Sequence, residues 1–184
     1  MKILRASERV RTLWKNGGGT TTEVAVHPPG AGFDDFGWRV SIADVRQGGP
    51  FSQFPGIDRC LAVLDGEMAL KIADRTPVVV SPDTPSALFS GDDRTDATLI
   101  GGAVVDLNVM TRRSAFTAKV AKHKLTAASA FKATTTTIGL VLNPLAVRTD
   151  HLDARDAVLV EPGEEIAFPS GSHLYWIEIF AQNR

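Results

Sequence analysis

Residues 51–66 read FSQFPGIDRCLAVLDG, in which a turn precedes a strand-like run. The Pro55-Gly56 pair is a strong turn signal, and most of the residues after it are apolar. Successive side chains of an extended strand point to opposite faces, so Arg59, Leu61 and Val63 share one face. The stretch therefore predicts a β-strand that places a guanidinium among apolar side chains.

Similar strand-like runs recur along the rest of the chain. They are short, rich in β-branched and aromatic residues, and lie at residues 21–26, 38–43, 61–64, 68–72, 78–80, 103–110, 134–142, 157–160 and 174–180. Turn signals separate them, among them Gly48-Gly49-Pro50, Asp65-Gly66, Ser90-Gly91-Asp92, Gly101-Gly102, Asn143-Pro144, Pro162-Gly163 and Ser170-Gly171. Most gaps are too short for a helix, so the pattern predicts an all-β sandwich or barrel. Residues 113–132 fit either a helix or a strand.

Length and charge narrow the classes of function. A chain of 184 residues can form one compact domain or two small ones. Its 20 basic and 21 acidic residues leave a net charge of −1 without a basic run, which argues against a nucleic-acid partner. No apolar run approaches the roughly 18 residues that a membrane-spanning helix needs, so we expect no membrane partner.

Cysteine use and the N-terminal sequence predict a cytoplasmic protein. Cys60 is the single cysteine, so an intrachain disulfide is impossible. The N-terminal stretch MKILRASERVRTLWKNGG is charged from its start and lacks the apolar core of a secretory signal. Cys60 follows Arg59, which would favour a reactive thiol, but the commoner role of a free cysteine is to fill a buried position.

The spacing around Arg59 resembles that of metal-binding cupin barrels, but the ligand residues are absent. Those barrels use two histidines one residue apart, then a glutamate, and a glycine after six more residues. Here Arg59 stands at the glutamate position before Gly66, and Ser52 and Phe54 stand at histidine positions, or Gln53 and Pro55 with a shorter gap. A guanidinium has no lone pair to donate, so we expect no metal and no other cofactor.

Several further motifs resemble the HutD/Ves family. They are Trp14-Lys15-Asn16-Gly17-Gly18-Gly19-Thr20, Trp38-Arg39-Val40-Ser41-Ile42-Ala43, Gly49-Pro50-Phe51-Ser52, Phe54-Pro55-Gly56-Ile57-Asp58-Arg59, Phe89-Ser90-Gly91-Asp92 and the run from Asp106 to Arg113. The resemblance implies a cupin (RmlC-like) β-barrel of the jelly-roll type, often doubled into a bicupin. It also implies a link to histidine utilisation and to an intermediate such as N-formylglutamate, without an established catalytic activity.

If the fold is a double barrel, the chain should divide into two domains. We expect residues 1–112 to form a first cupin-like barrel that carries the family motifs, and residues 113–184 to form a second, degenerate half. The runs LAVLDG at 61–66 and AVLVEPG at 157–163 end in a similar way, which is compatible with a weak internal duplication.

Arg59 is the central candidate for ligand binding. If it points into the barrel, its buried charge needs an anionic partner, because an unpaired buried charge costs several kcal/mol. That partner is either a bound carboxylate, which an arginine can hold through two parallel hydrogen bonds, or an internal acid such as Asp58 or Asp106.

The other candidate ligand residues follow from strand alternation and from one glycine-rich loop. Alternation sets polar faces against apolar ones along two strands, and the loop offers backbone N–H groups for an anion. With Arg59, the predicted set of ligand-binding residues comprises Lys15, Asn16, Arg39, Ser41, Ser52, Asp106 and Asn108.

We therefore predict a metal-independent protein that binds a small carboxylate metabolite as an accessory, sensor or regulator in histidine utilisation. An enzyme is the first alternative: an isomerase, epimerase or amidohydrolase with Asp58 or Asp106 as general base. No nucleophile elbow, dinucleotide motif or histidine cluster supports it, and we assign no catalytic residue. A protein-interaction scaffold is the second alternative. Cupins commonly self-associate, so a homodimer is compatible with the resemblance.

Overall fold

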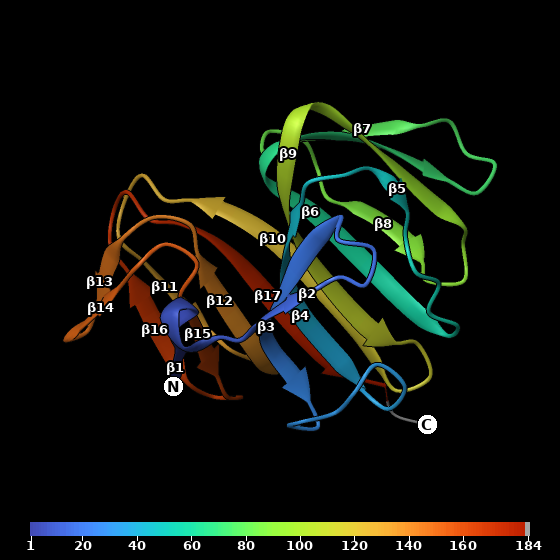
Figure 1. Cartoon of the computed structure of the whole chain (residues 1–184). Coiled ribbons are helices and arrows are strands. Elements are labelled where there is room, and N and C mark those ends of the chain that lie inside the picture. Colours follow the sequence, from blue (N-terminus) through green and yellow to red (C-terminus); the bar gives the residue numbers. More distant parts are fainter. Residues whose placement is uncertain (183–184) are drawn as a thin grey trace. The chain divides into compact units, whose positions relative to one another are not determined.

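The computed structural model describes residues 1–182, and the regular secondary structure of this part of the chain consists almost entirely of β-strands (Figure 1). A short 3-10 helix, η1 (Ala6–Glu8), is the one helical element among the described residues. The predicted all-β class is therefore confirmed. We find no helical segment in residues 1–182 with the length and hydrophobicity that a bilayer-spanning helix requires.

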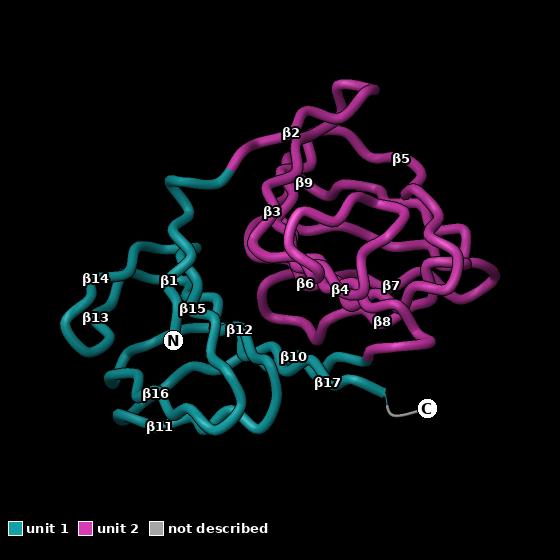
Figure 2. The backbone as a smooth tube through the Cα atoms, turned by 90° about the horizontal axis from the view of Figure 1, so that it is seen from below, with its two compact units in different colours: residues 1–9, 117–184 teal, residues 10–116 magenta. Residues whose placement is uncertain are grey.

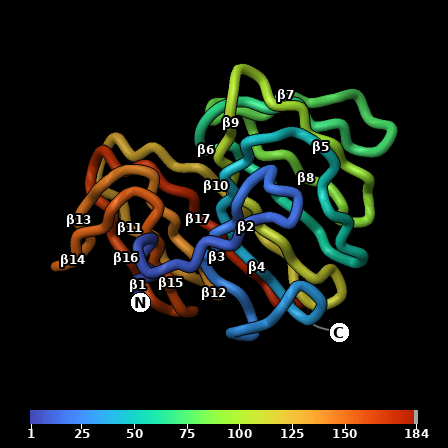
Figure 3. The backbone as a smooth tube through the Cα atoms, viewed as in Figure 1, coloured from blue at the N-terminus to red at the C-terminus, as the bar shows by residue number. Residues whose placement is uncertain are grey.

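The chain divides into two compact units (Figure 2). One comprises residues 10–116, and the other comprises residues 1–9 together with the chain from residue 117 onward. This division differs from the expected one at 112/113, above all because the first nine residues belong with the C-terminal unit. The reason is strand pairing: β1 (Lys2–Leu4) pairs with β15 (Ala157–Val160) in antiparallel orientation. Figure 3 shows the blue N-terminal segment beside the orange β15.

The unit of residues 10–116 is a single eight-stranded antiparallel sheet. Its path runs β2-β3-β4-β9-β6-β7, with β5 paired to β9 and β8 paired to β6. The strands are β2 (Arg11–Leu13), β3 (Gly19–His27), β4 (Trp38–Val45), β5 (Gly49–Pro50), β6 (Ile57–Ile72), β7 (Val78–Val80), β8 (Ala87–Ser90) and β9 (Thr95–Arg112). The long strands β6 and β9 form the centre of this sheet, because β9 pairs with both β4 and β6.

The Asp65-Gly66 pair lies within β6 instead of ending it, so the expected turn is a bulge. The register between β6 and β9 shifts on both sides of Asp65. Gly66 has φ +78°, and a Cβ at this position would come within 2.6 Å of the Ala103 carbonyl oxygen. The extra residue of β6 lies just before Gly66, where Leu64 and Asp65 are opposite the single residue Val105. It changes which positions face inward: Leu61 and Val63 lie in the same buried cluster as Met68, five residues after Val63.

The C-terminal unit contains one five-stranded sheet and two two-stranded sheets. The large sheet runs β1-β15-β12-β17-β10, and the small ones are β11-β16 and β13-β14. The remaining strands are β10 (Phe116–Lys124), β11 (Ser129–Lys132), β12 (Thr136–Val141), β13 (Leu145–Val147), β14 (Asp150–Leu152), β16 (Glu165–Phe168) and β17 (His173–Ala181). Strands β10 and β11 resolve the ambiguous segment 113–132 in favour of β-structure. A core that includes Phe168 and Trp176 fills this unit.

A buried carboxylate fastens the N-terminal segment to the C-terminal unit. Asp156 is buried, and its oxygens accept hydrogen bonds from the Ala6 N–H at 2.6 Å, from Arg5 Nη1 at 2.9 Å and from the Asp153 N–H at 3.1 Å. Burial by itself raises the pKa of Asp156, but the hydrogen bonds from Ala6, Arg5 and Asp153 together lower it below its usual value.

Replacing Asp156 with alanine should destabilise the C-terminal unit by about 2–4 kcal/mol, because the three donors lose a buried charged acceptor. Denaturant unfolding followed by the fluorescence of the buried Trp176 measures the loss. The lowered pKa means that this stabilisation is present above about pH 4 and disappears as the pH falls through the folded-state pKa, so parent and variant should converge in acid. Asp153→Ala, with its exposed side chain, is the matched control, and an equal loss in that variant would contradict the assignment.

Candidate functional site

Neighbouring strands place most of the predicted ligand residues on one face of the eight-stranded sheet. Residues paired directly across an antiparallel ladder point to the same side. On β9, Met110 pairs with both Arg39 of β4 and Arg59 of β6. One step along, Asn108 pairs with Ser41 and Leu61, and the next step pairs Asp106 with Ala43 and Val63. The structure thus brings Arg39, Ser41, Arg59, Asp106 and Asn108 together on the face that also carries the apolar core.

Arg59 is a buried cation without a contacting carboxylate. Only 8% of the surface of Arg59 is exposed to solvent. Nε and Nη2 both donate to Asn108 Oδ1, at 3.2 and 3.1 Å, and Nη1 reaches the Ser52 carbonyl oxygen at 3.5 Å. None of the ion pairs formed within residues 1–182 involves Arg59. Five N–H donors therefore face one neutral side-chain acceptor and one distant carbonyl.

Aromatic rings enclose the Arg59 guanidinium. Its central carbon lies 5.0 Å from the ring centroids of Phe51 and Phe89 and 5.8 Å from that of Phe54. These distances permit cation–π attraction, which partly offsets the loss of hydration. Burial lowers the pKa of Arg59 to about 10, a shift that the field of Asp106 opposes, so the group stays charged at neutral pH. Sequence reasoning missed the three phenylalanines as site residues, although all of them lie in the quoted motifs, because ring positions around a cation depend on the turn before β6 and on β8.

Asp106 is the second buried ionisable group of this face. It is 1% exposed, and its Oδ1 atom has no hydrogen-bond partner among the described residues. Burial raises the pKa of Asp106 to about 7, while the field of Arg59 and a hydrogen bond from the Asn108 side chain lower it and the nearby Asp44 raises it. Asn108 thus lies between the two groups, accepting from Arg59 and donating to Asp106.

Arg39 extends the polar row toward β3. Its Nη2 atom lies 3.1 Å from Glu23 Oε2, and its guanidinium stacks 4.3 Å from the centroid of the Phe33 ring. Phe33 in turn stacks on Phe54 with ring centroids 5.7 Å apart. The sequence did not mark Glu23 or Phe33, because their pairing with Arg39 arises across strands and loops. Unlike Arg59, Arg39 already has a carboxylate partner.

Three of the predicted residues occupy other positions. Lys15 and Asn16 are exposed, and Asn16 Oδ1 accepts from the Gly18 N–H at 3.0 Å within its own loop. That loop leads to Gly19, which pairs with Val45, six strand positions or roughly 20 Å from the level of Arg39 and Arg59. The structure therefore does not bring Lys15 and Asn16 to Arg59. Ser52 is exposed and contributes its backbone carbonyl, not its hydroxyl.

Asp58 is not the internal partner of Arg59. It lies on the opposite face of β6, where its Oδ1 accepts from Arg113 Nε at 2.8 Å. Arg113 also contacts Asp92 at 3.1 Å, so Asp58 belongs to a solvent-facing charge cluster. The proposed use of Asp58 as partner or general base in the same site is therefore wrong, and Asp106 is the acid on the Arg59 face. Cys60, the neighbour of Arg59, is buried, and burial raises the pKa of its thiol, so it fills a strand position.

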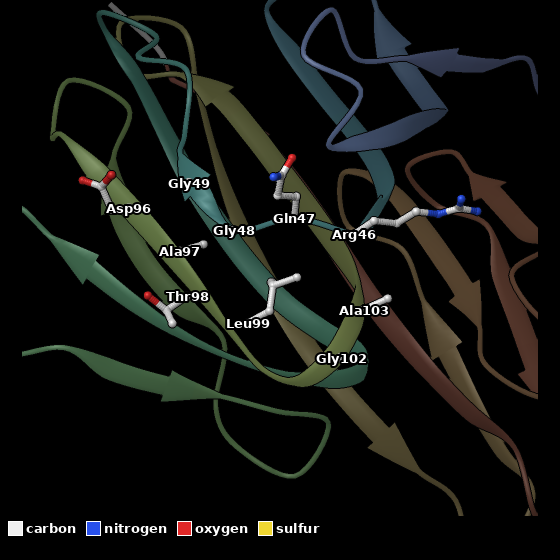
Figure 4. Close-up of a pocket in the computed structure, with 10 residues that line it drawn as sticks. All are labelled: Arg46, Gln47, Gly48, Gly49, Asp96, Ala97, Thr98, Leu99, Gly102 and Ala103. Atoms are coloured by element: carbon white, nitrogen blue, oxygen red, sulfur yellow. The ribbon is translucent and has the colours of Figure 1, made fainter.

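A wide surface groove lies elsewhere on this sheet (Figure 4). It has a volume of about 670 Å³ and is lined by Arg46, Gln47, Gly48, Gly49, Asp96, Ala97, Thr98, Leu99, Gly102 and Ala103. Only Ala97 among these lining residues is buried, and the Arg46 side chain points away from Thr98 and Leu99. None of the predicted ligand residues lines it. We place the candidate site at Arg59, because the groove contains no buried charge that a ligand would neutralise.

The residues at Arg59 do not fit the metal that many cupins carry. The positions equivalent to metal ligands hold Arg59, Ser52 and Phe54, and a guanidinium repels a cation. Within residues 1–182 no three His, Cys, Asp or Glu side chains are grouped closely enough to hold a metal ion. The site is instead suited to an anion.

Comparison with known proteins places the chain in a family. The HutD family matches residues 6–176. The chain belongs to the HutD family. Curated relatives of this HutD-family protein include an uncharacterized 21.2 kDa protein from the hutC 3′ region of Pseudomonas putida, 39% identical over 110 residues, and protein Ves of Citrobacter koseri, 41% identical over 110 residues. The alignments cover 60% and 59% of this chain, and the chain spans 57% and 56% of the length of these relatives.

Solved structures extend the comparison over almost the whole chain. HutD from Pseudomonas fluorescens SBW25, determined in a formate condition, has a TM-score of 0.85 at 28% identity, with 99% of both chains covered. A cupin 2 conserved barrel domain protein from Leptotrichia buccalis has a TM-score of 0.57 at 8% identity, with 88% of both chains covered. At that identity the likeness concerns the fold alone. The cupin fold and the HutD/Ves resemblance are thus confirmed.

The Asp106→Asn variant should change how the free energy of unfolding depends on pH. A raised folded-state pKa means that the native protein holds a proton that the unfolded chain has lost, so Asp106 makes the parent less stable as the pH rises from about 4 to 7. The variant lacks this term, and its stability relative to the parent should increase by up to about 1.4 kcal/mol per pH unit over that range. Denaturant unfolding between about pH 4 and 7, in buffers without carboxylates, measures the difference.

Asp96→Asn provides the matched control for this measurement. Asp96 lies on the same strand with an exposed side chain, so its variant should follow the parent. Parallel pH profiles of the parent and Asp106→Asn would show that Asp106 is ionised throughout and would contradict the assignment.

Proposed function

We propose that this protein binds a small carboxylate metabolite at Arg59, without a metal, and acts as a cytoplasmic accessory, sensor or regulator in histidine utilisation. The observation that carries the proposal is the buried guanidinium of Arg59, which lacks a contacting carboxylate. Its free N–H donors suit a carboxylate held by two parallel hydrogen bonds, a geometry that arginine favours. The enclosing rings of Phe51, Phe54 and Phe89 would exclude water from such a pair.

N-formylglutamate is the candidate ligand. The family is linked to a histidine-utilisation region by the name of the Pseudomonas putida relative, and the Pseudomonas fluorescens structure was determined in a formate condition. N-formylglutamate contains a formyl group and two carboxylates, so it agrees with both the formate condition and the expected carboxylate ligand. Formate itself is the smallest probe of the same chemistry.

Ligand binding should stabilise the parent protein and should depend on Arg59. A carboxylate at about 100 times its Kd adds roughly 2.7 kcal/mol to the free energy of unfolding. Arg59→Met keeps an apolar side chain of similar length but removes all five donors, so it should weaken binding at least about tenfold. Thermal unfolding and isothermal titration with N-formylglutamate, formate, glutamate, histidine and urocanate measure both effects.

Two further variants sharpen this test. Arg59→Lys keeps the charge but not the paired donors, so its affinity should fall between those of the parent and Arg59→Met. Arg94→Gln removes an exposed arginine of the same unit and should bind like the parent. Equal affinity of the parent and a folded Arg59→Met variant would disprove the site. Absence of binding by the parent to every probe would favour the scaffold alternative.

An enzyme remains the second candidate, because Asp106 has the properties of a general base. It is buried beside Arg59, its Oδ1 has no partner, and its pKa of about 7 suits proton transfer at neutral pH. Proton NMR of N-formylglutamate mixed with the protein in D₂O discriminates the candidates. Hydrolysis would release formate and glutamate, and an epimerase would exchange the Cα proton, whereas a binding protein leaves the spectrum of the ligand chemically unchanged.

A further inference from the structure

The chain of contacts Arg59–Asn108–Asp106 joins two buried ionisable groups through one amide. Asn108 Oδ1 accepts two hydrogen bonds from the guanidinium, which orients the amide so that its NH₂ group faces Asp106. The three side chains lie on one face of β6 and β9 in adjacent ladder positions. Asp106 Oδ1 has no hydrogen-bond partner among residues 1–182, so this oxygen can accept a proton without breaking a hydrogen bond.

Some groups around Asp106 favour its neutral form and others favour its ionised form. Its ladder partners are the apolar Ala43 on β4 and Val63 on β6, which favour the neutral carboxyl. Arg59 on β6 is the cation whose field favours the ionised form, and Asp44 on β4 is the acid whose field opposes it. The Glu23–Arg39 ion pair, from β3 and β4, lies further along the same face and is internally neutral.

A carboxylate ligand at Arg59 would favour the neutral form of Asp106. A bound carboxylate neutralises the guanidinium, which is the group that stabilises ionised Asp106, and it adds a second negative charge nearby. Ionised Asp106 is then an unpaired buried charge, and such a group takes up a proton instead of staying charged.

We infer that a carboxylate bound at Arg59 is taken up together with one proton on Asp106, so that binding weakens as the pH rises above neutrality. The inference rests on the proposed function and adds a form of regulation to the same site. The ligand keeps its negative charge, and the proton comes from solvent and forms an O–H bond on the Asp106 carboxyl. By linkage, the ligand raises the proton affinity of Asp106 by the same factor as the proton raises the affinity for the ligand.

Titration calorimetry of the intact protein with sodium formate and N-formylglutamate tests the coupling. Both probes carry constant charge between pH 6 and 9, so a change in Kd over this range belongs to the protein. We expect Kd to be nearly constant near pH 6 and to rise toward about tenfold per pH unit above neutrality. Repeating each titration in two buffers of different ionisation enthalpy counts the protons, and uptake should approach one per ligand at pH 8 and fall toward zero at pH 6.

Two variants assign the proton to Asp106. Asp106→Asn should bind the probes with a Kd that is independent of pH and without proton uptake. Asp44→Asn removes the acid that opposes ionisation of Asp106, so the pH at which binding weakens should move downward while one proton is still taken up. Asp44 is partly exposed and its paired strand residue is Val105, so this change leaves the Arg59 face intact.

Each result either supports or overturns the coupling between ligand binding and protonation of Asp106. A pH-independent Kd in the parent, with no proton uptake at pH 8, overturns the coupling while leaving carboxylate binding in place. Persistence of the pH dependence in Asp106→Asn also overturns it, because another group then carries the proton. If Asp106→Asn does not fold, the proton count in the parent and the shift in Asp44→Asn still decide. Failure of both probes to bind the parent at every pH overturns the proposed function and the coupling with it.

Discussion

The buried guanidinium of Arg59 is the constraint on which the rest of the site depends. A charge removed from water must be stabilised by hydrogen bonds, by aromatic faces or by an opposite charge. The protein supplies the first two through Asn108 and three phenylalanine rings, and within the described residues no carboxylate contacts the cation. The unfilled requirement is what makes this position suited to an anionic ligand instead of a purely structural ion pair.

The neighbouring acid gives the site a second property. Asp106 acts on Arg59 through space and through the Asn108 amide, without direct contact. Two buried groups of opposite sign that share one polar bridge titrate as a coupled pair, so a change at one alters the charge state of the other. A direct ion pair would have held both groups charged and would have occupied donors that a ligand carboxylate can use. In the proposed mechanism, the separation by Asn108 therefore couples the binding of a carboxylate to the protonation of Asp106.

The bulge at Leu64 and Asp65, which both lie opposite Val105, allows one face of the sheet to carry the site and the core. Before the bulge, β6 turns Arg59 toward the site, and after it the inward residues Met68 and Leu70 belong to the apolar core. Without the extra residue, the alternation of the strand would turn Met68 outward. Gly66 follows the bulge, and glycine is required at this position because its φ is positive and the Ala103 carbonyl leaves no space for a Cβ. The polar site and the core are thus continuous along the same strands.

The sequence by itself determined the all-β class, the positions of several strands, such as those at 38–43, 78–80, 157–160 and 174–180, and the place of Arg59 among apolar side chains, because alternation and turn residues are local properties. It also placed Arg39, Ser41, Asp106 and Asn108 on polar strand faces. Only the tertiary structure showed that Asp58 faces solvent with Arg113, that Lys15 and Asn16 lie far along the sheet, and that the first nine residues pack with the C-terminal unit. Those facts depend on register and on pairing between distant strands, and local patterns cannot specify which face of a sheet meets which neighbour.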